Sequence, residues 1–223
     1  MKRSEINHYI AEALKIFEEH QIHLPIWAHW SIDDWKENKA KANEVFTARL
    51  GWDITDFGCG AYEQRGLFLF TLRNGAPPVY EKPYAEKYMI VKENQETPLH
   101  YHWKKQEDII NRGGGVLVLE LFDCDDRDRP VARDLKIRID GIETIVPEGE
   151  RVYLKNGQSI AMPRGLYHRF YALEGKGYVL AGEVSSINDD DGDNRFHEDL
   201  GRFPMIEEDE LPLRLLVGDY KTL

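Results

Sequence analysis

The sequence predicts a mainly β protein in which antiparallel strands close into a barrel behind a helical N-terminal segment. From about residue 60 onward, short runs of aliphatic, β-branched and aromatic residues alternate with turns rich in Gly, Pro, Asn and Asp. These runs follow one another too closely for crossover helices, so the strands must pair mainly antiparallel. With 42% hydrophobic and 11% aromatic residues, the 223-residue chain can bury the core of one domain.

Residues 1–55 are expected to be helical and to pack on the barrel or on a partner subunit. Ser4 can cap a first helix, because apolar residues recur after it at three- and four-residue spacing. Ser31 and Asp34 fit a capping box, which predicts a second helix that continues until Gly51. Both helices are amphipathic and therefore need a surface to cover.

Residues 56–223 are expected to form the barrel, with about nine or ten strands. Asp140-Gly141 is typical of a tight hairpin, and Asn156-Gly157 marks a second turn. The segments predicted to be strands are, in chain order, GLFLFTL, KYMIV, TPLHYHW, VLVLELF, LKIRID, TIV, RVYL, SIAMP, HRFYAL and GYVLAGEV.

Composition argues against several classes of partner. With 29 Lys+Arg against 40 Asp+Glu, the net charge of -11 would repel nucleic acid. No apolar run approaches the ~20 residues that cross a bilayer, and the first ten residues hold no apolar export signal. The two cysteines are too few for a disulfide scaffold, which agrees with a reducing compartment. We therefore expect a cytoplasmic protein that binds a small molecule, and neither nucleic acid nor a membrane.

Four residues predict a metal site. His100 and His102 are two residues apart, so a strand would put both imidazoles on one face, about 7 Å apart along the backbone. Glu107 can return to that face if the chain reverses after His102, and His168 follows a turn that contains Pro and Gly. Three imidazoles and one carboxylate leave open positions on Mn, Fe, Co, Ni or an expanded Zn. The spacing predicts one divalent ion per chain.

The spacing of these residues resembles the two cupin motifs, which implies a jelly-roll cupin barrel. Two positions depart from the usual pattern: Asn94 replaces the glycine six residues before the first histidine, and Ala172 replaces a closing Asn. Neither change removes a ligand, and Asn94 tolerates a positive φ. The two spacings are His100-x-His102-x4-Glu107-x6-Gly114 and Gly157-x5-Pro163-x-Gly165-x2-His168.

Across essentially the whole chain, the sequence resembles the bacterial D-lyxose isomerases of the cupin class. The segments that carry the resemblance are MKRSEINHYIAEALKIFEEH, LPIWAHWSIDDW, EKYMIVKENQETPLHYHWKKQEDIINRGGG and GEVSSINDDDGDNRF. The resemblance implies a homodimeric aldose–ketose isomerase that uses Mn²⁺ or a similar divalent ion. Its implied substrates are the unphosphorylated sugars D-lyxose and D-xylulose, with D-mannose and D-fructose slower.

Such an isomerase moves a proton between C1 and C2 of the sugar through a metal-bound cis-enediol, and therefore needs a base near these carbons. Glu183 shares one strand face with Ser185, so it is the best candidate for a base inside the barrel. Lys87 alternates with Met89, and its ammonium could point inward and polarise a sugar oxygen. Whether Glu183, Lys87 or Asp193 is the base stays open, as does a hydride shift in place of the enediol.

Three further residues are candidates for binding the sugar. Asp193 and Arg195 directly follow the strand of Glu183, and could form a rim pair that holds sugar hydroxyls. Trp103 could give the sugar ring an apolar platform.

Two other functions fit a cupin barrel. A dioxygenase or oxidase would use the same ligands to hold Fe²⁺ or Mn²⁺, but oxygen activation does not need the extra acid and lysines. A sugar-sensing cupin without turnover usually carries a DNA-binding domain, and no basic region of that kind is present. The isomerase therefore ranks above both alternatives.

Overall fold

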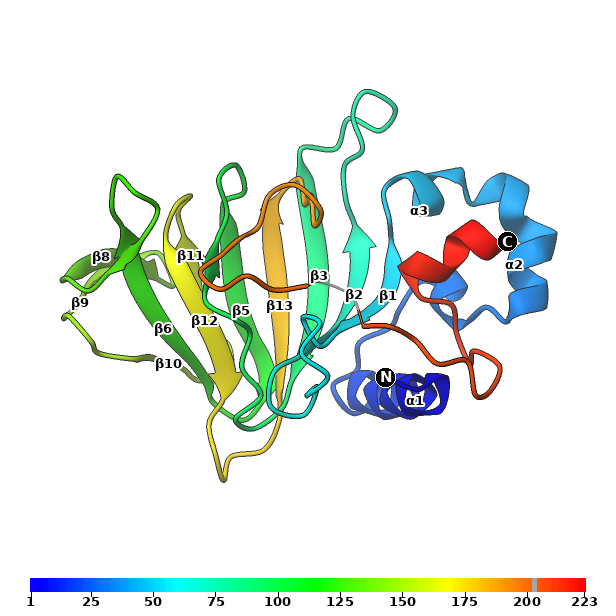
Figure 1. The fold of residues 1–223 in the computed structure, drawn as a ribbon, viewed down its shortest axis with the longest axis horizontal. Coiled ribbons are helices and arrows are strands. Elements are labelled where there is room, and N and C mark those ends of the chain that lie inside the picture. The colour runs from blue at the N-terminus through cyan, green and yellow to red at the C-terminus, as the bar shows by residue number, and fades with distance from the viewer. Residues whose placement is uncertain (202–203) are drawn as a thin grey trace.

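The computed structural model describes residues 1–201 and 204–223, and these form two curled antiparallel sheets with helices at one end (Figure 1). The larger sheet has the strand order β1-β2-β3-β13-β5-β11-β8-β9, and the smaller one has the order β10-β6-β12-β4-β14. Every pairing between these strands is antiparallel. The predicted mainly β barrel with an N-terminal helix is therefore confirmed.

The helices lie near the two chain ends and the strands lie between them. The helical elements are α1 Arg3–Glu19, η1 Ile26–His29, α2 Ile32–Asn38, η2 Lys39–Lys41, α3 Asn43–Thr47 and η3 Val217–Thr222. The strands are β1 Gly51–Thr55, β2 Leu67–Arg73, β3 Tyr84–Val91, β4 His100–Tyr101, β5 Glu107–Gly114, β6 Leu117–Cys124, β7 Pro130–Val131, β8 Leu135–Ile139, β9 Ile142–Val146, β10 Val152–Leu154, β11 Ser159–Met162, β12 Tyr167–Ala172, β13 Val179–Ser186 and β14 Arg195–Phe196. None of the helices among the described residues is long and apolar enough to span a membrane.

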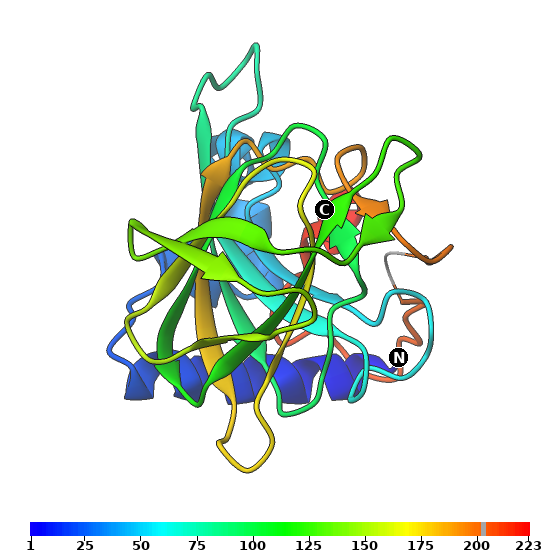
Figure 2. The ribbon, with the colours of Figure 1, turned by 90° about the vertical axis from the view of Figure 1, so that its left-hand side faces the viewer.

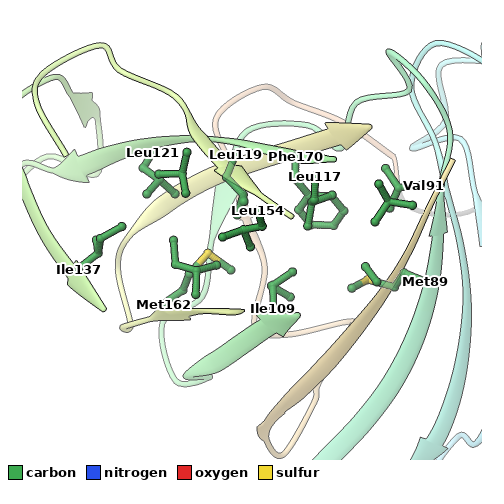
Figure 3. Packing of buried hydrophobic residues seen from close by; sticks show 14 of the residues in the cluster. Met89, Val91, Ile109, Leu117, Leu119, Leu121, Ile137, Leu154, Met162 and Phe170 are labelled. Atoms are coloured by element: carbon green, nitrogen blue, oxygen red, sulfur yellow. The ribbon is translucent and has the colours of Figure 1, made fainter. Parts of the chain in front are cut away.

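Figure 2 shows how the strands curl around a common interior. The barrel core lies there, between the inner faces of the two sheets (Figure 3). Along β5, buried and more accessible residues alternate, and Ile109 points into the core with 1% exposure. Leu117 and Leu119 of β6 meet it from the smaller sheet, and both are completely buried. This packing fixes the strands whose inward-pointing polar residues, such as Glu107 of β5, form the site next to the core.

A second apolar cluster joins α1 to the outer face of the larger sheet. Ile6, Ile10 and Phe17 are buried there against residues of β1 and β2 that include Trp52 and Phe70. The outer face of β1–β3 is thus covered, as the amphipathic pattern of the first helix predicts. The inner face of the same strands remains available for the site.

The N-terminal helices differ from their sequence prediction in two ways. Helix α1 begins at Arg3, so Ser4 lies inside it, and the Ser4 hydroxyl donates to Asp209 instead of capping the helix. The capping box of Ser31 and Asp34 is present, but the second helix does not continue to Gly51. It stops at Asn38, whose side-chain amide donates to the carbonyl of Asp34, a bond that competes with helix continuation.

Four strands were not predicted from the sequence, and two of these, β7 and β14, have only two residues each. Strand β1 begins at Gly51, within the segment expected to be helical, and β5 covers EDIINRGG. The sequence of β5 lacks the apolar alternation of a typical strand, because only Ile109 among its inward residues is aliphatic. The other inward residues are Glu107, Asn111 and Gly113. The Asp140-Gly141 hairpin between β8 and β9 is confirmed, and Asn94 has the positive φ of 56° that its position in the first motif requires.

Candidate active site

Three histidines meet inside the barrel, next to its apolar core. His100 lies on β4 and His102 directly follows that strand, while His168 lies on β12, where it pairs with His100 across the sheet. One ring nitrogen from each of the three lies within 4.8 Å of the others. The structure thus confirms that the two motifs converge and form a triad positioned to bind a metal ion.

Backbone carbonyls orient all three rings. The Nδ1 atoms of His100, His102 and His168 lie 2.8, 2.7 and 3.0 Å from the carbonyl oxygens of Pro98, Asp193 and Leu166. A carbonyl can only accept, so each Nδ1 must carry the proton, and each Nε2 keeps its lone pair. Histidines that bind metals are typically oriented in this way.

The electrostatics of the triad also suit a cation. Burial, followed by the neighbouring His168 and His102, holds the pKa of His100 well below its usual value. Burial and the nearby Lys105 lower the pKa of His102. Both imidazoles are therefore neutral at pH 7, which is the form that binds a metal.

Glu107, the first residue of β5, adds an oxygen to the triad. Its Oε1 lies 3.5 Å from Nε2 of His102 and 3.2 Å from Nε2 of His168, and its side chain is 3% exposed. Burial would raise the pKa of Glu107, but Lys105 and the two histidines outweigh this and hold it well below its usual value. Three lone pairs and an ionised carboxylate around one point are a donor set that fits a divalent metal ion.

Lys105 is a functional candidate that the sequence analysis missed. Its Nζ lies 2.5 Å from Oε2 of Glu107 and 3.0 Å from Oε1 of Glu183, and the side chain is 4% exposed. Burial alone would lower the pKa of Lys105, but the two carboxylates raise it. The sequence signal for Lys105 is its spacing of two residues from Glu107, which would place both side chains on one face of a strand. Lys105 itself lies in the irregular turn before β5, where this alternation does not apply.

Glu183 and Lys87 both point into the barrel, as the alternation of their strands predicts. They pair across β13 and β3, with Nζ of Lys87 3.5 Å from Oε1 of Glu183. Ser185 donates a hydrogen bond of 2.9 Å to the same oxygen, and Lys87 also donates to Asn188. Burial would raise the pKa of Glu183, but Lys105 and Lys87 together lower it, so the group is an ionised carboxylate at neutral pH.

A cavity joins the histidines to these charged groups. Glu183, Lys87 and Lys105 lie on its wall together with the triad and Glu107, so the structure brings all six predicted metal and catalytic residues together. The rest of the wall is mainly apolar, and it is formed by Phe57, Leu67, Leu69, Met89, Ile109, Phe170 and Phe196, with Thr55, Thr97, Asp190 and Asn194 between them.

The three predicted sugar-binding residues do not line this cavity. Asp193 is 2% exposed, and its carboxylate accepts hydrogen bonds from backbone N–H groups. Arg195 is exposed and donates to the carbonyl of Phe196, so no rim pair with Asp193 is present among the described residues. Trp103 is 48% exposed and packs edge-on against Tyr101.

Comparison with known proteins identifies the family. A D-lyxose isomerase family model matches residues 1–220. The chain belongs to the D-lyxose isomerase family. It is 46% identical to a D-lyxose/D-mannose isomerase of Escherichia coli O157:H7 over 224 residues, which cover 99% of each chain. It is 45% identical to a D-lyxose/D-mannose isomerase of Serratia proteamaculans over 223 residues, which cover 99% of this chain and 98% of the relative.

Solved structures with the same fold include two L-ribose isomerases. That of Acinetobacter sp. DL28, in complex with L-ribose, has a TM-score of 0.59 and 16% identity, covering 92% of this chain and 98% of the other. That of Geodermatophilus obscurus has the same TM-score, identity and coverage. Membership of the D-lyxose isomerase family makes this chain an enzyme, an aldose–ketose sugar isomerase, and favours this function over the oxidase and the non-catalytic alternatives.

The donor set predicts that purified protein contains one divalent ion per chain. In a His100→Ala/His102→Ala double variant, two of the three imidazoles are lost, so the metal content should fall close to zero. Elemental analysis measures this directly. His8→Ala, which changes an exposed histidine outside the triad, is the control and should keep its metal. Equal metal content in the double variant and the wild type would rule out the site.

Proposed function

We propose that this family member interconverts D-lyxose and D-xylulose, and D-mannose and D-fructose more slowly, by proton transfer through a cis-enediol. The two relatives are D-lyxose/D-mannose isomerases, which supports D-lyxose and D-mannose as the aldose substrates. The observation that carries the mechanism is the ionised, buried Glu183 on the wall of the cavity that holds the histidine triad.

The proposed ligands of the ion are His100, His102, Glu107 and His168. Mn²⁺ is our first choice, and Co²⁺, Fe²⁺, Ni²⁺ and Zn²⁺ suit the same donors. When bound, a divalent ion stabilises the negative charge that develops on sugar oxygens during enolisation.

Glu183 is the proposed base. Its hydrogen bonds with other described residues all go to Oε1, which accepts from Lys105 and Ser185. Oε2 is therefore left to take the proton from C2 of the aldose and to return it to C1. The two lysines keep the carboxylate ionised, so it is ready to accept a proton at neutral pH.

Lys87 and Lys105 are proposed to stabilise charge rather than to act as bases. Each ammonium lies against a carboxylate, and the raised pKa of Lys105 keeps it protonated throughout the physiological range. Positive charge held at the wall of the cavity favours the developing enediolate over the neutral sugar.

We also propose that the enzyme is a homodimer, which the family resemblance supports, and that it lies in the cytoplasm, which the low cysteine content supports. Light scattering should then give the mass of two chains.

The substrate assignment predicts the result of a sugar panel. Metal-loaded enzyme should convert D-lyxose fastest and D-mannose more slowly, and activity lost to a chelator should return with Mn²⁺ or Co²⁺ more than with Mg²⁺. Product sugars are measured by chromatography. Oxygen consumption without isomerised product would overturn the assignment and favour an oxidase.

Substitution of the proposed base has a defined effect. Glu183→Gln keeps the size of the side chain but cannot accept the C2 proton, so kcat should fall roughly 10²–10⁴-fold. Metal content should stay near one ion per chain, because Glu183 is not a proposed ligand. Glu150→Gln, at an exposed position, is the matched control and should be as active as the wild type. Near-normal turnover by Glu183→Gln would exclude this residue as the base.

Turnover in D₂O distinguishes the two possible paths. If Glu183 exchanges its proton with solvent before returning it, the ketose product should carry deuterium at C1. Mass spectrometry and NMR of the product measure this. Product without deuterium would favour a hydride shift or a base shielded from exchange.

A further inference from the structure

We propose that Asp193 is a positioning residue that fixes both the Lys105 turn and the His102 ring, and that it does not contact the sugar. Only the expected effect of Asp193 on turnover rests on the proposed function. Its effects on the backbone and on metal affinity can be measured whether or not the proposed substrates are correct.

Each oxygen of the Asp193 carboxylate accepts a hydrogen bond from the backbone. Oδ1 accepts a hydrogen bond of 2.8 Å from the N–H of Lys104, and Oδ2 accepts one of 2.7 Å from the N–H of Lys105. The residue is 2% exposed, so these bonds are shielded from water. Two charge-assisted bonds to consecutive N–H groups define the course of the turn that carries the Lys105 ammonium to Glu107 and Glu183.

The backbone of Asp193 holds a metal-site residue at the same time. Its carbonyl oxygen lies 2.7 Å from Nδ1 of His102. His100 and His168 use carbonyls two residues earlier in their own segments, so their orientation is set locally. His102 instead depends on a residue 91 positions away in the sequence. The placement of one distant residue therefore affects both the proposed ligand His102 and the charge-bearing Lys105.

The segment that carries Asp193 is itself well anchored. The N–H of Asp193 donates to the carbonyl of Asp189, whose side chain also accepts from the N–H of Gly192. At the start of the segment, Asn188 exchanges hydrogen bonds with Asn74, which links it to the end of β2 in the larger sheet. These bonds place Asp193 before any ligand arrives, as a positioning role requires.

Asp193→Asn tests the role of the carboxylate with almost no change in size. An amide offers one acceptor oxygen in place of two, so one of the two N–H groups loses its partner and the turn should open more easily. The control is Asp191→Asn, which removes the same charge from the same segment. The Asp191 side chain is 61% exposed and pairs with Arg49 at the surface.

In the full-length enzyme, Asp193→Asn is expected to change three properties together: amide exchange, metal affinity and turnover. Amide hydrogen exchange at Lys104 and Lys105, followed by NMR, should be slow in the wild type and about tenfold faster in Asp193→Asn. Metal affinity, measured by competition with a chelator, should weaken about tenfold, as is typical when a group that orients a ligand is disturbed. For the sugar, kcat should fall while KM changes little. Asp191→Asn should match the wild type in all three.

Several outcomes would overturn the proposal. Unchanged exchange and metal affinity in Asp193→Asn would show that the carboxylate does not hold the turn. A raised KM with unchanged kcat would instead indicate contact with the sugar. If the variant does not fold, hydrogen exchange in the wild type still tests the proposal. Amides of Lys104 and Lys105 that exchange as fast as an exposed backbone would contradict their hydrogen bonds to Asp193. If no sugar is turned over by the wild type, the proposed function fails while the exchange and metal results continue to test Asp193.

Discussion

The buried ammonium of Lys105 is the interaction on which the rest of the site depends. It lies between the carboxylates of Glu107 and Glu183, and all three side chains are nearly inaccessible to water. Two carboxylates this close inside a barrel would repel each other and would become protonated without a positive charge between them. Lys105 keeps both ionised, so that one can contribute to a cation site and the other can serve as a base. Lys105 is thus needed both for the cation site at Glu107 and for the base Glu183.

Strand register brings the two carboxylates together. In β13, Glu183 lies opposite Lys87 of β3, and Ser185 lies opposite Glu107 of β5. Because side chains alternate between faces, residues two apart on β13 share the inner face, and so do their cross-strand partners. A slip of one residue would move Glu183 to the outer face, where its neighbour Val184 is 46% exposed. The helix packed against the outside of β1–β3 stabilises this register without entering the cavity.

The sequence predicted those site residues whose direction is set by neighbouring residues in the chain, and it missed or misplaced those held by distant segments. The histidines were recognisable because motif spacing and strand alternation determine where they point, and Glu183 and Lys87 followed from alternation alone. Lys105 was missed since its direction is set by an irregular turn that needs Asp193 from a distant segment. Asp193 was interpreted as a rim residue that binds sugar because it directly follows the strand of Glu183. Its burial follows from tertiary contacts that no local pattern contains.

The charge balance of the cavity also bears on the kind of sugar it can accept. Among the residues that the structure describes, Lys87 and Lys105 are the lysines on its wall. Both are already matched by Glu183 and Glu107, with Asp190 a further acid 3.8 Å from Lys87. A sugar phosphate would bring up to two negative charges into a space where, apart from the proposed metal ion, no described lysine is left unpaired to receive them, at a high cost of desolvation. An uncharged sugar avoids this cost, and its ring can lie along the apolar wall while its hydroxyls meet the charged end. The proposed preference for unphosphorylated substrates therefore has a physical basis in the pairing of these side chains.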